Sequence, residues 1–267
     1  MTEETKNIPK VIFAGFASCF GCQINITNIE QYLLDVLGQI DMQYWQLTSS
    51  DPMPEDFDVC VIEGAITTEE ALETAKALRE VADTVITIGA CAKTAGIPGM
   101  ASLDYGPRQG DVYAEDVPNV VSQVAFAPRS VKDVIAVDFE VPCCPVDPYT
   151  FVEVLQKALN GSNAYERTST MCGECKQNER GCFYGRGVLC LGMVTQSGCH
   201  AKCPNLGRPC NGCAGLSEDA NLEAARRIVS RSGIDEAAFD VAITMFNQTN
   251  PRIISADEQS APVAQEG

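Results

Sequence analysis

The chain has 267 residues, a formal net charge of −17, 45% hydrophobic residues and 14 cysteines. This length suits one large or two modest domains, and the hydrophobic content is enough to build a core, which excludes a disordered chain. The acidic excess argues against partners such as nucleic acids or anionic lipid surfaces. We expect no membrane insertion, because no apolar run approaches the roughly 20 residues that cross a bilayer.

The start of the chain, MTEETKNIPK, is polar, and the apolar run after it is too short for a secretory signal. We therefore expect a cytoplasmic protein. Disulfides are disfavoured in that compartment, where clustered cysteines usually indicate metal or redox chemistry.

Apolar, β-branched runs alternate with amphipathic runs over the first 160 residues. The runs predict strands at 10–15, 42–47, 58–66, 84–90 and 133–141. Helical periodicity indicates helices at 24–37, 67–82 and 148–161. Thr67 and Glu70 fit a capping box, and Asp147 precedes a proline that can open a helix. Alternation of this kind predicts an α/β fold with a parallel sheet and helices on its faces.

The composition of the sequence changes near residue 162. Residues 97–130 already read as an irregular insertion, and residues 171–215 are rich in Cys and Gly with little apolar periodicity. Two helices are expected near 219–231 and 235–246, followed by a frayed tail over 255–267. We predict two domains, 1–163 and 164–267, the second being irregular and helical.

Five cysteines follow predicted strands. Cys19 and Cys22 follow the first strand, Cys91 follows the strand at 84–90, and the adjacent pair Cys143 and Cys144 follows the strand at 133–141. The carboxyl ends of parallel strands share one edge of a sheet, so these thiols are expected to converge. Cys19, Cys22, Cys91 and one of the pair suit an iron–sulfur cluster. Cys60 lies inside a strand and reads as a small core residue.

Eight more cysteines lie in the C-terminal part, enough for two four-ligand sites: Cys172, Cys175, Cys182, Cys190, Cys199, Cys203, Cys210 and Cys213. Zinc also takes four thiolates and uses C-x2-C pairs, so these eight alone do not separate zinc from iron–sulfur. The N-terminal constellation favours iron–sulfur, because three clusters form a path for single electrons. His200, the only histidine, follows Cys199 and is either a hydrogen-bonding neighbour of the site or an exposed loop residue.

The ordered motifs resemble a known family. SCFGC, EGAI, IGACAKTAGIPG and PCCPVDP look like the proximal-cluster motifs of NiFe-hydrogenase small subunits, and CLGMVTQSGCHAKCP with RPCNGC looks like their medial-cluster region. The resemblance spans roughly residues 10–215. Cys172 stands where periplasmic relatives carry histidine, which points to the cytoplasmic multimeric hydrogenases of F420-reducing, heterodisulfide-reductase-associated, NAD(P)-linked or sulfhydrogenase type.

The resemblance implies a flavodoxin-like N-terminal domain and three 4Fe–4S clusters. It implies proximal ligands Cys19, Cys22, Cys91 and Cys144, distal ligands Cys172, Cys175, Cys182 and Cys190, and medial ligands Cys199, Cys203, Cys210 and Cys213. The family motif usually has Gly where this chain has Cys143, so either thiol of the pair is a candidate, and Cys144 is chosen because it precedes Pro145. Some relatives have Pro at the position of Cys203 and carry a 3Fe–4S cluster, so the thiol here implies 4Fe–4S.

Two sites near the proximal motifs bear on proton transfer and on phosphate binding. Many hydrogenases have a Glu one or two residues after the second proximal Cys, whereas Gln23 and Ile24 stand here. The resemblance therefore implies that proton transfer runs through the large subunit. Lys93 does not complete a phosphate-binding loop, because it precedes the second Gly of its motif, and it reads as a surface or interface charge.

The predicted function is that of a non-nickel subunit of a hydrogenase. The NiFe centre would lie only in a partner large subunit, and single electrons would pass through three clusters to a flavin- or ferredoxin-type subunit. One alternative is an iron–sulfur relay of a complex that does not process hydrogen, since the same fold recurs in respiratory complex I. A zinc-bearing interaction protein and a flavoprotein are further alternatives. The last is disfavoured because FASCFGCQ lacks the Ser/Thr-rich turn that binds a flavin phosphate.

Overall fold

The computed structural model describes residues 8–101, 128–162, 167–177, 179 and 181–254. The predicted tail, most of the predicted insertion at 97–130 and the proposed domain boundary at 163/164 lie outside these residues.

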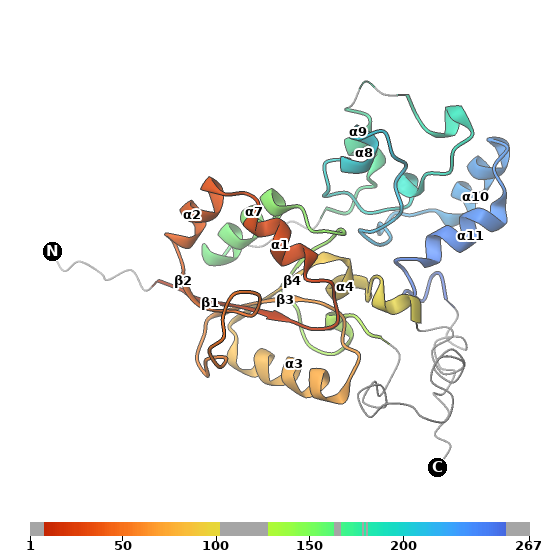
Figure 1. The fold of residues 1–267 in the computed structure, drawn as a ribbon. Coiled ribbons are helices and arrows are strands. Elements are labelled where there is room, and N and C mark those ends of the chain that lie inside the picture. The colour runs from red at the N-terminus through yellow and green to blue at the C-terminus, as the bar shows by residue number, and fades with distance from the viewer. Residues whose placement is uncertain (1–7, 102–127, 163–166, 178, 180, 255–267) are drawn as a thin grey trace, which may run out of the picture.

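Five parallel strands form a single sheet (Figure 1). They are β1 (Lys10–Gly15), β2 (Asp41–Trp45), β3 (Val59–Glu63), β4 (Thr84–Ile88) and β5 (Phe139–Val141). Their order, β2-β1-β3-β4-β5, is the flavodoxin-like order, which places the topological switch point between β1 and β3. The predicted fold class is confirmed. β1 to β4 begin and end within a few residues of the predicted runs, whereas β5 ends where predicted but begins six residues later.

Helices cover both faces of the sheet. In Figure 1, α3 (Glu69–Val81) lies on one face, and α1 (Gly21–Thr27), α2 (Gln31–Leu37) and α7 (Pro148–Leu159) lie on the other. Alternate strand residues therefore enter two cores. Ile12, Cys60 and Ile62 pack with α3, whereas Phe13, Val61 and Ile86 pack with the other helices. Cys60 is fully buried in the first of these cores, as predicted.

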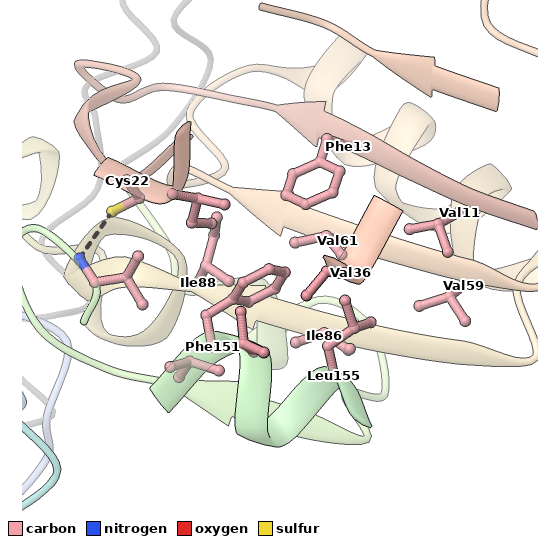
Figure 2. Close-up of a cluster of buried hydrophobic side chains, with 14 of the residues drawn as sticks. Val11, Phe13, Cys22, Val36, Val59, Val61, Ile86, Ile88, Phe151 and Leu155 are labelled. Carbon is pink, nitrogen blue, oxygen red and sulfur yellow. Dashed lines mark hydrogen bonds between the residues drawn. The ribbon is translucent and has the colours of Figure 1, made fainter. Parts of the chain in front are cut away.

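The second core leads to the first candidate ligands. Figure 2 shows the labelled side chains of β1, β3, β4 and α7 in contact, with Cys22 at one end of the cluster. Phe13 stacks on Trp45 with ring centroids 4.5 Å apart and meets Phe151 edge-on at 5.7 Å. This packing fixes the carboxyl end of β1, from which the first two candidate thiols extend.

Three local predictions were wrong in detail. The predicted helix 24–37 is two helices, α1 and α2, because the chain leaves the helical conformation at 28–30, where Glu30 has φ +38°. The N-cap of α3 is Thr68 rather than Thr67, and its side chain accepts the amide of Ala71. The predicted strand 133–141 keeps only its last three residues. Asp133 instead caps a 3-10 turn by accepting the amide and hydroxyl of Ser130.

The C-terminal part packs beside α4 (Gly89–Thr94), at the carboxyl edge of the sheet (Figure 1). It contains the short helices α8 (Cys172–Cys175) and α9 (Lys202–Asn205), and then α10 (Leu222–Arg231) and α11 (Glu236–Thr244), which confirm the two predicted helices. Leu191, Val229 and Phe239 form a small core between the last two helices and the Cys-rich loops. Among the described residues, no helix combines the length and apolar character that crossing a bilayer requires.

Candidate metal centre

The carboxyl edge of the sheet brings four predicted ligands together. Cys19 lies in the loop after β1, Cys22 in the first turn of α1, Cys91 in α4 and Cys144 after β5. Burial first, and then nearby Glu63 and the thiols of Cys144 and Cys91, raise the pKa of Cys22. Burial raises the pKa of Cys144 to about 11, and the thiols of Cys213, Cys91 and Cys19 raise it further, Cys213 the most of the three. These mutual effects show that the four thiols are neighbours.

Glycines leave room beside these thiols. A Cβ on Gly89 would lie 2.4 Å from the sulfur of Cys22, and Gly89 has φ +83°, a conformation that side chains disfavour. A Cβ on Gly21 would lie 3.1 Å from the sulfur of Cys19. The backbone amide of Val146 also donates to the Cys22 sulfur at 3.4 Å, the dashed contact in Figure 2. Four thiols, small neighbours and an amide donor fit a cysteine-ligated cluster.

Glu63, at the end of β3, is a buried carboxylate that the sequence reasoning passed over. Its two oxygens accept the backbone amides of Cys22 and Gln23 at 3.2 and 3.1 Å. The carboxylate therefore fixes the first turn of α1 and holds the Cys22 thiol at the sheet edge. An acidic residue closing an otherwise apolar strand, VCVIE, is the signal that could have found it.

The adjacent residues Cys143 and Cys144 differ in burial and in most of their thiol neighbours, although both lie near Cys213. Cys144 is exposed among the sheet-edge thiols, whereas Cys143 is buried and its thiol makes hydrogen-bonding contact with the thiols of Cys199 and Cys213. Cys143 has φ +90°, where glycine is the usual residue. The contact with Cys143 lowers the pKa of Cys199 to about 7 and also lowers the pKa of Cys213.

The eight C-terminal cysteines fall into two neighbouring groups. Burial raises the pKa of Cys172 to about 11, with the thiols of Cys190, Cys175 and Cys182 contributing next. Cys203 has Cys213 and Cys199 as its nearest thiol neighbours, and Cys210 has Cys213 and then Cys190. The amide of Cys210 donates to the Cys190 sulfur at 3.3 Å, so the two groups touch through these residues. In the described parts of the chain, no three His, Cys, Asp or Glu side chains meet closely enough to hold a single metal ion.

Glu174 links these two groups and was also missed. It lies inside the C-G-E-C motif, and its carboxylate accepts the backbone amides of Gly198 at 2.8 Å and Ala201 at 3.2 Å, on either side of Cys199. Arg167 pairs with the same carboxylate at 2.9 Å. An acid between the two cysteines of a C-x2-C pair was the available signal.

Three other predicted residues occupy different surroundings. Lys93 is buried, with 6% of its surface exposed, so of the two alternatives predicted for it, a surface or an interface charge, the surface charge is wrong. Gln23 is also buried, and its side-chain carbonyl accepts the indole N–H of Trp45 at 2.8 Å. His200 is exposed, with its Nε2 3.5 Å from the hydroxyl of Thr150.

Comparison with known proteins identifies the family. Residues 19–158 match the family described as NADH ubiquinone oxidoreductase, 20 Kd subunit. The chain belongs to this family. It is 30% identical to a subunit of the vhu F420-non-reducing hydrogenase of Methanocaldococcus jannaschii, over 87% of this chain and 90% of that protein. It is 31% identical to the delta subunit of sulfhydrogenase 2 of Pyrococcus furiosus, over 82% of this chain and 91% of that protein.

A solved structure shows the same fold. The actinobacterial-type NiFe-hydrogenase of Ralstonia eutropha superposes with a TM-score of 0.53 at 19% identity, covering 92% of this chain and 88% of that one. Together these similarities confirm the resemblance to NiFe-hydrogenase small subunits, and place this member of the 20 kDa subunit family among hydrogenase subunits.

Proposed function

We propose that the chain is the electron-transfer subunit of a cytoplasmic NiFe hydrogenase and holds three 4Fe–4S clusters. It would carry single electrons between the NiFe centre of a partner large subunit and a flavin- or ferredoxin-type acceptor. The observation that carries this proposal is the placement of the candidate thiols: four follow strands at the carboxyl edge of the sheet, and eight lie in the C-terminal region that packs beside that edge. Each cluster, when bound, supplies a one-electron redox centre.

The contacts between groups support the order of the three sites. Cys144 belongs to the sheet-edge group, and its neighbour Cys143 touches Cys199 and Cys213. This supports Cys199, Cys203, Cys210 and Cys213 as the medial ligands. Cys172, Cys175, Cys182 and Cys190 then form the distal set, reached through the contact between Cys210 and Cys190. Cys182 is exposed, as a site of exchange with an acceptor requires.

The same contacts support Cys144 as the fourth proximal ligand, alongside Cys19, Cys22 and Cys91. The Cys143 thiol contacts Cys199 and Cys213 of the C-terminal region, so this assignment gives it no ligand role. The protein's own work is to hold each thiol and to place hydrogen-bond donors near sulfur. The amides of Val146, Cys210 and Gly212 all donate to cysteine sulfur in this structure. Such donors tune cluster potentials.

The sheet edge beside Cys19 also carries exposed apolar side chains. Ile24, Tyr32 and Tyr149 are about half exposed, at 47%, 57% and 57%, and the two tyrosine rings meet edge-on. These residues come from α1, α2 and α7, beside the proposed proximal site. We propose that the large subunit covers this surface, in an interface at the obligate end of the size range. We also retain the division into domains 1–163 and 164–267 as part of the proposal.

A relay subunit of a complex that does not process hydrogen is the second candidate, favoured by the description of the matched family. The family match, however, ends at residue 158, before the eight C-terminal cysteines. The relatives that extend over most of the chain, the C-terminal region included, are hydrogenase subunits. This difference favours the hydrogenase.

The test is isolation of the native complex under anaerobic conditions through a tag on this chain, followed by analysis of nickel, iron, zinc and sulfide. We expect hydrogen-dependent reduction of a viologen dye and about twelve iron atoms assignable to this chain, four for each cluster. Cys182→Ala should lower the iron content by about four atoms, whereas the matched variant Cys60→Ala, in the apolar core, should not change it. Iron and sulfide without nickel or hydrogen activity would support the second candidate, and zinc in place of iron would refute both.

A further inference from the structure

Lys93 is a buried cation near the centre of the molecule, and the proposed function gives it no role. It lies in α4, two residues after Cys91. In the described part of the chain, no other Lys or Arg is buried. Taking an ammonium group out of water is costly unless its partners compensate, so its contacts indicate what the fold gains by burying it.

The lysine reaches from the N-terminal sheet to the C-terminal Cys-rich region. Its Nζ donates to the side-chain carbonyl of Gln196 at 2.6 Å, in a buried hydrogen bond between residues 103 positions apart. On the N-terminal side, Nζ lies 3.7 Å from the carboxylate of Glu140 in β5. The same carboxylate pairs with Lys132, half exposed, at 3.5 Å. The carboxylate of Glu140 thus holds Lys93 from the N-terminal sheet, and the side-chain amide of Gln196 holds it from the C-terminal Cys-rich region. Lys93 therefore bridges the junction between these two parts.

Gln196 is itself held by the segments that carry the proposed medial ligands. Its amide N–H donates to the carbonyl of Gly215 at 3.0 Å, two residues after Cys213. Its side-chain NH2 donates to the carbonyl of Arg167 at 2.9 Å. Gln196 also precedes Cys199 by three residues. A displacement of the Gln196 side chain would therefore also displace the loops on both sides of the proposed medial site.

We propose that Lys93 is a positioning residue that fixes the spacing between the proximal and medial clusters by holding Gln196. The inference rests on the proposed function, because it presumes that both sites are loaded. The hydrogen bond from Thr150 Oγ1 to the carbonyl of Gly198, which crosses the same junction, is longer, at 3.4 Å. Single-electron transfer slows steeply with separation, so a looser junction slows transfer without removing either cluster.

The test uses the complete complex with four variants of this chain. Lys93→Met and Gln196→Leu each break the link at similar side-chain size, and Lys93→Arg keeps a donor. Lys132→Met is the matched control, because Lys132 pairs with the same Glu140 but does not contact Gln196. The readouts are iron content, the spin–spin interaction between reduced clusters in electron paramagnetic resonance, and the freeze-quench rate at which hydrogen reduces the C-terminal clusters.

We expect Lys93→Met and Gln196→Leu to keep their iron, to weaken the spin–spin interaction and to slow reduction of the C-terminal clusters about 10- to 100-fold, since a misplacement of about 1 Å can slow a reaction about 100-fold. Lys93→Arg should retain the interaction, and Lys132→Met should match the wild type. Wild-type interaction and rate in a fully loaded Lys93→Met complex would overturn the inference. If that variant does not assemble, the same result in Gln196→Leu overturns it. A wild-type complex with no interacting cluster signals would overturn the proposed function as well.

Discussion

Removing the Glu174 carboxylate gives a direct measure of how the Cys199 loop is held. In Glu174→Ala, the buried amides of Gly198 and Ala201 lose their acceptor. Hydrogen bonds to charged groups contribute about 1.5–3 kcal/mol each, so the pair is worth about 3–6 kcal/mol. The Arg167 pair adds little, because a third of the arginine side chain is exposed.

The lower value, about 3 kcal/mol, predicts a measurable change in the rate of iron release. A loss of about 3 kcal/mol raises the population of the opened loop roughly 100-fold, at 1.36 kcal/mol for each factor of ten. When the loop opens and closes faster than a chelator captures iron, iron release follows this population. We therefore expect anaerobic release of iron from the C-terminal part to a strong chelator to be about 100-fold faster in Glu174→Ala.

Glu223→Ala is the matched control for this experiment. Glu223 lies on α10, where its mostly exposed side chain pairs with Arg227. An exposed i,i+4 pair contributes about 0.3–0.5 kcal/mol, so this variant should release iron at nearly the wild-type rate. If Glu174→Ala released iron less than about threefold faster than the control, the carboxylate would not be holding the loop and the reasoning from two charged hydrogen bonds would be refuted.

Three further predictions concern the sheet-edge site and the core. Cys144→Ala should lose about four iron atoms, whereas Cys143→Gly should keep them, because glycine suits the backbone at φ +90°; equal losses would contradict our ligand assignment. Gly89→Ala should also lose about four iron atoms, since its Cβ would lie 2.4 Å from a ligand sulfur. Gly161→Ala, with φ +64° and no atom within 4 Å of its Cβ, should keep all its iron and lose only about 1 kcal/mol of stability. Burial raises the pKa of Cys60 to about 12, so its thiolate is scarce at pH 8 and iodoacetamide should label it only after unfolding; rapid labelling of the folded complex at that pH would refute its burial.

The sequence predicted the sheet because β1, β3 and β4 are short apolar runs whose burial requires a partner on both faces. β3 and β4 are almost wholly buried, and both were found within a few residues. β5 was overestimated, since a capping interaction by Asp133 outweighs the β propensity of the residues that follow. Local side-chain hydrogen bonds of this kind carry little signal in a pattern of apolar residues.

The ligand candidates were predictable for a similar reason, as thiols at strand ends must converge wherever the strands are parallel. The groups that support them were not. Glu63 and Lys93 are charged residues whose burial depends on partners 40 and 103 positions away. Nothing local distinguishes such a buried charge from a solvated one, which is why a surface charge was one of the two alternatives predicted for Lys93. The different burial and thiol neighbours of Cys143 and Cys144 likewise follow from tertiary contacts alone.

The position of Cys143 and Cys144, between the sheet edge and the Cys-rich region, has a consequence for how the protein matures. Because the sheet has its own apolar cores, we expect it to fold before any metal arrives and so to place the β5 end that carries both thiols. The Cys-rich region has a smaller apolar core, so we expect its folding to depend more on bound metal. The folded sheet would then hold the Cys144 thiol at the proposed proximal site and the Cys143 thiol near Cys199 and Cys213 of the Cys-rich region. We therefore expect the sheet to serve as the support on which the Cys-rich region assembles with its metal, so that defects in the sheet appear as missing iron far from the site of damage.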